Sequence, residues 1–115
     1  MATIKVDNQT FEVEDGTRLV LALEEGGVDI LHLCGGNARC TTCRVEFAEG
    51  EPSAMTAAER NILDKKELAG VARLSCQIQC EATMEVRPMM RVSTSDFDEP
   101  GAIPASAITP DPEWI

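Results

Sequence analysis

The sequence contains few aromatic residues and no tyrosine. Its aromatic side chains are three phenylalanines and one tryptophan: Phe11, Phe47, Phe97 and Trp114. With 115 residues the chain is long enough for one domain with a modest core. That core must be mostly aliphatic, so a bound metal group would add to its stability.

Positive charge is also scarce. Ten Lys and Arg residues stand against twenty Asp and Glu residues, which gives a formal net charge of −10. Nucleic acids and anionic membranes are poor partners for such a surface, because they would be repelled by it. A basic protein partner is the natural complement, and opposite charge would speed its encounter with this chain. The acidity could equally serve only to keep the protein soluble.

Long apolar runs and targeting signals are missing. No stretch approaches the roughly 20 apolar residues of a membrane span. The opening Met1-Ala2-Thr3-Ile4-Lys5 lacks the basic and then apolar pattern of a secretory signal. We therefore expect a soluble, cytoplasmic, monomeric protein whose five cysteines are metal or redox ligands before they are disulfides.

Four of the five cysteines have a spacing that is typical of a chain wrapped around a metal cluster. Cys34, Cys40 and Cys43 lie within ten residues, and residues 44–75 separate them from Cys76. The plant-type arrangement of [2Fe–2S] ligands is Cys-x4-Cys-x2-Cys with a distant fourth cysteine, whereas the first gap here holds five residues. Soft thiolate donors suit the iron–sulfur core.

The residues between these cysteines fit such a loop. Gly35–Gly36 tolerate positive φ and would let the backbone curl closely around a cluster. Backbone amides of the loop could donate hydrogen bonds to sulfur, as could Thr41–Thr42, which would look identical as ordinary turn residues. Arg39 and Arg44 flank the loop and could offset the charge of a cluster or pair with nearby carboxylates.

Other metal sites fit the sequence less well. Structural zinc usually takes two Cys-x2-Cys pairs, or one such pair with two histidines. Here there is one pair, Cys40 and Cys43, and one histidine, His32. A Rieske centre needs two histidine ligands, and the bacterial [4Fe–4S] run needs tighter spacing. The pattern favours [2Fe–2S], with zinc as the alternative.

The Cys34–Cys43 loop and the segment Arg73-Leu74-Ser75-Cys76-Gln77 resemble the [2Fe–2S] ferredoxin family. The five-residue gap is similar to the branch of adrenodoxin and the bacterial cluster-assembly ferredoxins, and the Cys-Gly-Gly opening also looks like ferredoxin modules fused to some bacterial cyclases. The resemblance covers residues 2–90. It implies a β-grasp (ubiquitin-like) fold of the α+β class, a small mixed sheet with a helix packed across it and a cluster-binding loop.

The resemblance also implies a site and a function. The ligands of the [2Fe–2S] cluster would be Cys34, Cys40, Cys43 and Cys76. The protein would be a soluble one-electron carrier, not an enzyme, that works between a ferredoxin reductase and an acceptor such as an oxygenase or a biosynthetic enzyme. Two other functions remain open: a protein of iron–sulfur cluster assembly or delivery, and a redox-sensing regulatory module that acts in trans.

In adrenodoxins an acidic stretch before the fourth cysteine docks the reductase. The corresponding acids of this chain are Glu59, Asp64 and Glu67. They are interleaved with basic residues: Arg60, Lys65 and Lys66.

The hydrophobic pattern predicts the elements of an α+β domain. Residues 3–6 and 10–13 alternate and read as a hairpin, and a helix capped by Thr17 or Asp15 should end at Gly26–Gly27. Residues 44–47 predict a strand. The capping box from Thr56 to Glu59 predicts a short helix through Leu63. An extended segment near Leu74 and a strand over residues 83–87 are the last predicted elements of the domain.

A change of composition divides the chain into a ferredoxin domain over residues 1–91 and a tail over residues 92–115. The tail has five acids, no Lys or Arg and four of the six prolines, so it cannot sustain a helix. We expect it to be flexible or to wrap onto a surface, and to be a candidate for docking a partner. Trp114 could anchor to that partner or have no role.

Two further residues invite a functional interpretation. Cys80 could be a spare thiolate, although a small buried side chain at a strand end is the simpler expectation. His32 could couple protons to electrons near the cluster, although a packing or solvated role is simpler.

Overall fold

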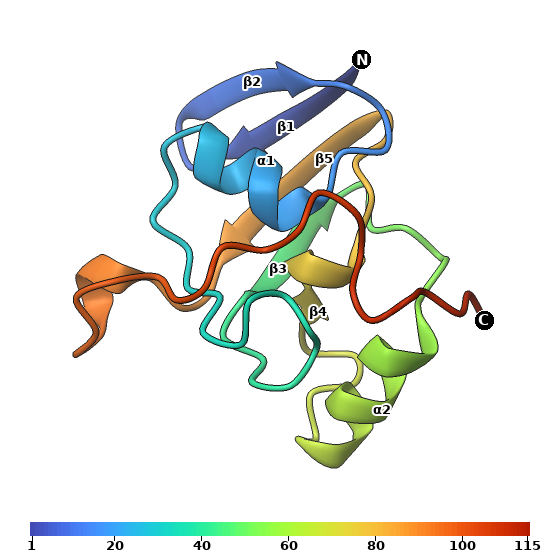
Figure 1. The fold of residues 1–115 in the computed structure, drawn as a ribbon. Coiled ribbons are helices and arrows are strands. Elements are labelled where there is room, and N and C mark those ends of the chain that lie inside the picture. The colour runs from blue at the N-terminus through green and yellow to red at the C-terminus, as the bar shows by residue number, and fades with distance from the viewer.

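The computed structural model describes residues 1–115 and shows a five-stranded mixed sheet in the order β2-β1-β5-β3-β4 (Figure 1). The strands β1 and β5 are parallel, and the other neighbours are antiparallel. The strands are β1 (Ala2–Val6), β2 (Gln9–Val13), β3 (Arg44–Glu49), β4 (Arg73–Leu74) and β5 (Thr83–Pro88). The helices are α1 (Leu19–Glu25) and α2 (Ala57–Lys65), with short 3₁₀ turns η1 (Ser75–Gln77) and η2 (Val92–Thr94).

The helix α1 lies across one face of the sheet, over β1 and β5 (Figure 1). Alternate residues of β1 point into the core, and the apolar side of α1 packs with them. The central core side chains are almost fully buried: Ile4, Val6, Leu19, Leu23, Met84 and Val86. This arrangement confirms the predicted α+β class and the β-grasp fold.

The start of α1 differs from the prediction. The helix begins at Leu19, and neither Thr17 nor Asp15 caps it. The Thr17 hydroxyl donates to the Glu14 carbonyl at 2.7 Å, and the Asp15 carboxylate faces the amino terminus. The residue at the cap position is Arg18, whose side chain turns into the interior instead of closing the helix.

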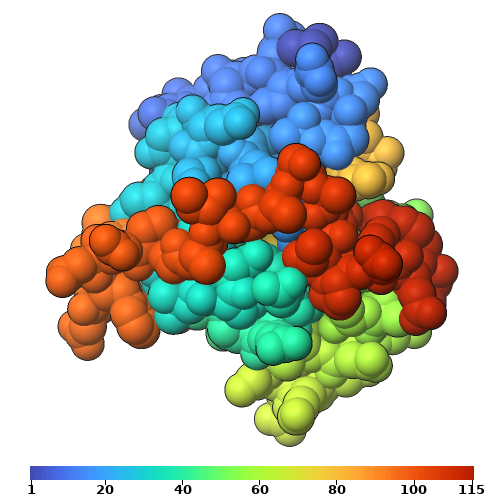
Figure 2. Space-filling view, in the orientation of Figure 1, coloured from blue at the N-terminus to red at the C-terminus, as the bar shows by residue number.

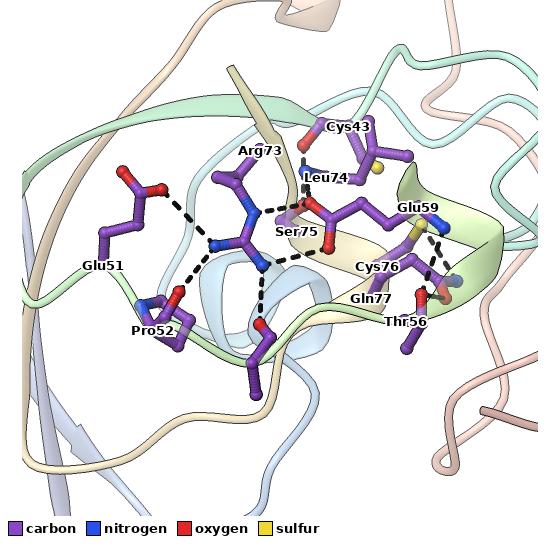
Figure 3. Close-up of polar contacts among 11 residues, drawn as sticks. Cys43, Glu51, Pro52, Thr56, Glu59, Arg73, Leu74, Ser75, Cys76 and Gln77 are labelled. Carbon is purple, nitrogen blue, oxygen red and sulfur yellow. Dashed lines mark hydrogen bonds and ion pairs between the residues drawn. The ribbon is translucent and has the colours of Figure 1, made fainter. Parts of the chain in front are cut away.

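The start of α2 agrees with half of the predicted capping box. The Thr56 hydroxyl accepts a hydrogen bond from the Glu59 amide at 3.1 Å, as an N-cap residue does. The Glu59 carboxylate does not reach back to the Thr56 amide. It contacts Arg73 instead, through Nε at 2.7 Å and Nη2 at 3.1 Å, and accepts from the Leu74 amide at 2.9 Å (Figure 3). None of the helices is long and apolar enough to cross a membrane.

The buried Glu59–Arg73 ion pair connects α2 to the edge strand β4. Burial by itself would lower the pKa of Arg73, but the hydrogen bonds and charge of Glu59, together with the charge of Glu51, raise it above its usual value. Glu59 is fully buried, so it cannot belong to an exposed docking stretch, whereas Asp64 and Glu67 are exposed. The pair fixes β4 immediately before Cys76, and it therefore helps to place that cysteine.

Residues 92–115 lie along the surface of the domain as an extended band (Figure 2). Near its start, the band is fixed by the Asp29 carboxylate, which accepts from the Ser93 amide at 2.9 Å. At its end, the Glu113 carbonyl accepts from the Ala57 amide at 2.8 Å and the Ile115 amide donates to the Met55 carbonyl at 3.0 Å. The chain therefore ends beside the start of α2.

Replacing Glu59 by alanine should lower the free energy of unfolding by about 3 kcal/mol, because Arg73 would keep a buried charge without its partner. The measurement is urea unfolding of the oxidised protein followed by far-ultraviolet circular dichroism. Asp64→Asn is the matched control on the exposed side of the same helix and should change stability by less than about 0.5 kcal/mol. Equal effects of the two substitutions would contradict a structural role for the pair.

Candidate metal centre

The loop between α1 and β3 and the turn η1 bring the four predicted ligands together as two pairs of sulfur atoms. Cys34 and Cys40 form one pair, and Cys43 and Cys76 form the other, because the two sulfurs of each pair shift each other's pKa. The second pair is buried, and the first is half-buried near the surface of the loop. The four cysteines thus lie in two pairs, and their assignment as cluster ligands stays a prediction.

Each pair holds one sulfur that favours the thiolate and one that favours the thiol. Hydrogen bonding from Cys40 and from backbone amides lowers the pKa of Cys34 to about 4, while the same contact raises that of Cys40. A hydrogen bond from Cys43 lowers the pKa of Cys76, and this contact with burial raises the pKa of Cys43. Each pair thus places two sulfur atoms close enough to act on each other, and a metal ion would bind them in their deprotonated form.

The loop directs hydrogen-bond donors at its sulfur atoms. The Cys34 amide donates to Cys40 Sγ and the Asn37 amide donates to Cys34 Sγ, both at 3.3 Å. The Thr42 hydroxyl lies 3.1 Å from Cys40 Sγ, as the sequence suggested for this residue. Thr41 does not contact sulfur. Its hydroxyl donates to the Cys40 carbonyl and accepts from Arg44 Nη2 at 2.7 Å.

The two glycines of the loop are required by its conformation, as predicted. Gly35 and Gly36 have φ values of 72° and 86°, a region that favours glycine. A Cβ atom at Gly36 would lie 2.7 Å from Nη2 of Arg18, which is too close for any side chain. The backbone therefore curls tightly at this point because an arginine packs directly against it.

Arg18 is the functional residue that sequence reasoning missed. Its guanidinium donates from Nε to the Cys76 carbonyl at 2.7 Å and from Nη1 to the Ala105 carbonyl at 2.9 Å. Nη2 donates to the Gly36 carbonyl. Burial lowers the pKa of Arg18, and the thiolates of Cys76, Cys43 and Cys34 oppose that change. Nothing in the sequence separates this arginine from a surface residue at the start of a helix.

Gln77 also connects the loop with the end of the chain. It is fully buried, and its Nε2 donates to the Thr109 carbonyl at 2.8 Å and lies 3.6 Å from Cys76 Sγ. Its Oε1 accepts from the Thr56 hydroxyl at 2.7 Å. Residues 100–109, here called the C-terminal strap, therefore pack on the cysteine loop, and Ile108 in this strap is buried. In Figure 2 the strap lies between the loop and the amino-terminal part of the domain.

The side chains of the other residues singled out in the sequence make no hydrogen bond to the sulfur atoms of the two pairs. Cys80 is buried in the core, and burial raises its pKa to about 12, which agrees with a packing role. His32 is also buried, with Nε2 against the Glu24 carboxylate and Nδ1 without a partner. Arg39 is exposed, and Arg44 donates to the Thr41 carbonyl. Neither arginine forms an ion pair with a carboxylate, which was one of the two roles expected for them.

The residues present fit a [2Fe–2S] cluster. Two pairs of thiols match two iron atoms, each of which would take two protein ligands. The site also supplies amide donors and a positive charge, both of which suit an anionic cluster. No three His, Cys, Asp or Glu side chains converge in the way that a single metal ion requires.

Comparison with known proteins agrees with this chemistry. Residues 2–81 match the family described as the 2Fe-2S iron-sulfur cluster binding domain. The chain belongs to this family. Its cofactor is therefore a [2Fe–2S] cluster, as predicted, and the zinc alternative is set aside.

Among curated relatives, this [2Fe–2S] domain is similar to part of one subunit of the Na(+)-translocating NADH-quinone reductase. The relative from Methylococcus capsulatus is 32% identical over 78 residues, which are 68% of this chain and 19% of that protein. The relative from Idiomarina loihiensis is 31% identical over 80 residues, which are 70% of this chain and 19% of that protein. The chain spans about a fifth of the length of these relatives.

Among solved structures, the domain is similar to the Amycolatopsis cytochrome P450 reductase GcoB, with a TM-score of 0.63 and 27% identity over 77% of this chain and 26% of the other. It is also similar to a ferredoxin from Rhodopseudomonas palustris, with a TM-score of 0.53 and 27% identity over 77% and 96% of the two chains. The ISC-like [2Fe–2S] ferredoxin FdxB from Pseudomonas putida, 24% identical with a TM-score of 0.62 over 76% and 91%, shares the fold.

Substitution of single cysteines should separate the ligands from the core cysteine. We expect Cys43→Ser to abolish or grossly alter the visible spectrum of the oxidised protein, because one iron would lose a thiolate ligand. Cys80→Ser, the matched control, should keep the spectrum because its sulfur makes no contact with the two pairs. Loss of the native spectrum in the Cys80 variant would overturn the ligand assignment.

Removal of residues 100–115 should make the cluster bleach several-fold faster in the presence of a chelator and oxygen, because Arg18, Gln77 and the loop would become hydrated. The absorbance of the oxidised cluster measures this rate. A chain that ends at Asp111 is the control, since it keeps the contacts of Ala105, Ile108 and Thr109 and loses only those beside α2. Equal rates for the two truncated chains would exclude a protective role for the strap.

Proposed function

We propose that this chain is a one-electron carrier that passes electrons from a reductase to an acceptor enzyme and catalyses no reaction itself. The observation that carries the proposal is the pairing of four thiols in a loop that also holds amide donors and a buried cation. This arrangement stabilises an anionic metal centre.

In this proposal Cys34 and Cys40 would hold one iron and Cys43 and Cys76 would hold the other. When bound, the cluster supplies a site that gains and loses a single electron. The chain's own residues hold the four sulfurs in place and limit the entry of water. The Cys34 and Asn37 amides donate to sulfur, which favours the electron-rich form of the site. The strap and η1 cover the buried pair.

The names of the relatives support a reductase as a partner. The Na(+)-translocating NADH-quinone reductase and the cytochrome P450 reductase GcoB are reductases in which the matched domain is a small part of a longer chain. By analogy, this domain exchanges electrons with a reductase, either within one longer chain or as a separate carrier. The five-residue gap between Cys34 and Cys40 supports the adrenodoxin and bacterial ferredoxin branch.

The charge distribution supports a basic partner surface. With Glu59 buried, the docking acids of this proposal lie elsewhere, among exposed residues such as Asp64, Glu67 and Glu25. We propose a ferredoxin domain over residues 1–91, a tail over residues 92–115 that covers the loop, and a monomeric, cytoplasmic carrier. Cluster delivery and redox sensing are less well supported, because the strap and the buried Cys43–Cys76 pair favour retention of the cluster.

The proposal is tested by reducing the protein stoichiometrically with dithionite and mixing it rapidly with oxidised cytochrome c, a basic electron acceptor. We expect one electron to be transferred per chain, at a rate that falls as salt increases because attraction to the acidic surface is screened. A ferredoxin reductase with NAD(P)H should then reduce the protein in catalytic amounts. Transfer of iron and sulfide to an apo acceptor, without net electron transfer, would instead establish cluster delivery.

A further inference from the structure

We propose that Arg18 raises the reduction potential of the cluster, because it places a fixed and buried positive charge beside the Cys43–Cys76 pair. Arg18 lies outside the cysteine loop in sequence, directly before α1, and reaches the site across the interior. The proposal rests on the cofactor of the family and does not depend on the identity of a partner protein.

The charge of Arg18 has no carboxylate partner. Only 1% of the residue is exposed, yet the ion pairs of the molecule involve other cations. The other buried guanidinium, that of Arg73, is neutralised by Glu59. Its three hydrogen bonds to the backbone go to the carbonyl groups of Cys76, Ala105 and Gly36.

The buried charge of Arg18 needs a negative charge other than a carboxylate to compensate it. A buried cation is costly unless an anion compensates it, and three carbonyl dipoles satisfy its donors without neutralising its charge. The sulfur atoms of the site are the negative groups that its contacts bring close, because the guanidinium donates to the carbonyl of Cys76 and to that of Gly36, which lies between Cys34 and Cys40. The cluster bound by these sulfurs is therefore the counter-ion of Arg18.

The charge of the cluster decides in which direction Arg18 shifts the reduction potential. An oxidised [2Fe–2S] cluster with four thiolate ligands carries a charge of about −2, which becomes about −3 on reduction. A nearby positive charge stabilises the more negative state more strongly, so it favours reduction. Because Arg18 is buried, solvent and salt screen this interaction much less than they screen a surface charge.

The chain offers a matched control in Arg39. This arginine belongs to the cysteine loop itself, between Cys34 and Cys40, but its side chain is exposed to solvent. Sequence alone would rank Arg39 above Arg18 as a residue that tunes the cluster. The structure reverses that order, because burial decides how much of a charge the cluster senses.

The experiment compares reduction potentials of the purified holoprotein and its Arg18→Met, Arg18→Lys and Arg39→Met variants, each titrated with small redox mediators. We expect Arg18→Met to lower the equilibrium constant for reduction at least about tenfold, which is a fall of about 59 mV for one electron. Arg39→Met should shift it by less than about threefold. Arg18→Lys should stay nearer to the native value. In high salt the Arg39 shift should shrink, and the Arg18 shift should persist.

Three outcomes would overturn the proposal: an Arg18→Met shift no larger than that of Arg39→Met, an equal fall for Arg18→Lys and Arg18→Met, or a failure of Arg18→Lys to hold the cluster. If Arg18→Met fails to hold the cluster, Arg18→Gln, which keeps a side-chain donor without the charge, replaces it in the same comparison of reduction potentials. The mediator titration needs no protein partner, so failure of the reductase assay would refute the proposed function and leave this result unaffected.

Discussion

The hydrogen bonds of the Arg18 guanidinium join three separate parts of the chain. They reach the Cys76 carbonyl in η1, the Gly36 carbonyl in the cysteine loop and the Ala105 carbonyl in the strap. The loop, the turn that carries the fourth cysteine and the end of the chain thus depend on one buried cation for their relative positions. Gly36 lacks a side chain because this contact leaves no room for one.

The molecule stabilises its two buried arginines by different means. Arg73 forms an ion pair with Glu59, and the neutralised pair fixes α2 against β4, where Glu59 also accepts from the Leu74 amide. Arg18 has carbonyl partners only, so its charge stays available to the site next to it. The same type of side chain therefore supports the fold in one place and the chemistry of the site in the other. The difference lies in the presence or absence of a nearby carboxylate.

The fold and the cofactor could be predicted from the sequence because their signals are local. Alternation predicted β1 and β2, the Thr56 capping signal predicted α2, and the cysteine spacing predicted a [2Fe–2S] cluster. Arg18 and Gln77 could not be predicted, because their importance arises from contacts with residues far away in sequence. Burial is the physical quantity that decides such cases, and a single sequence does not reveal which polar side chains turn inward.

The same limit explains the prediction errors at Glu59 and at the start of α1. A glutamate three residues after an N-cap threonine favours a reciprocal capping contact, but a buried arginine competes more strongly for its carboxylate. Likewise, Thr17 is a good cap residue by type, yet the inward turn of Arg18 moves the first helical residue to Leu19. Long-range electrostatics outweighed local propensity in both places.

At Gly101, near the start of the strap, a Cβ atom would lie 2.6 Å from the Leu33 backbone, so this end of the strap touches the main chain beside the loop directly. Because it is covalently attached, the strap behaves as a ligand at an effective concentration on the order of millimolar. A partner that approaches the loop from this side meets a surface that is already occupied. Its binding must either include the strap in the contact or displace it, and displacement would subtract from the affinity of the complex.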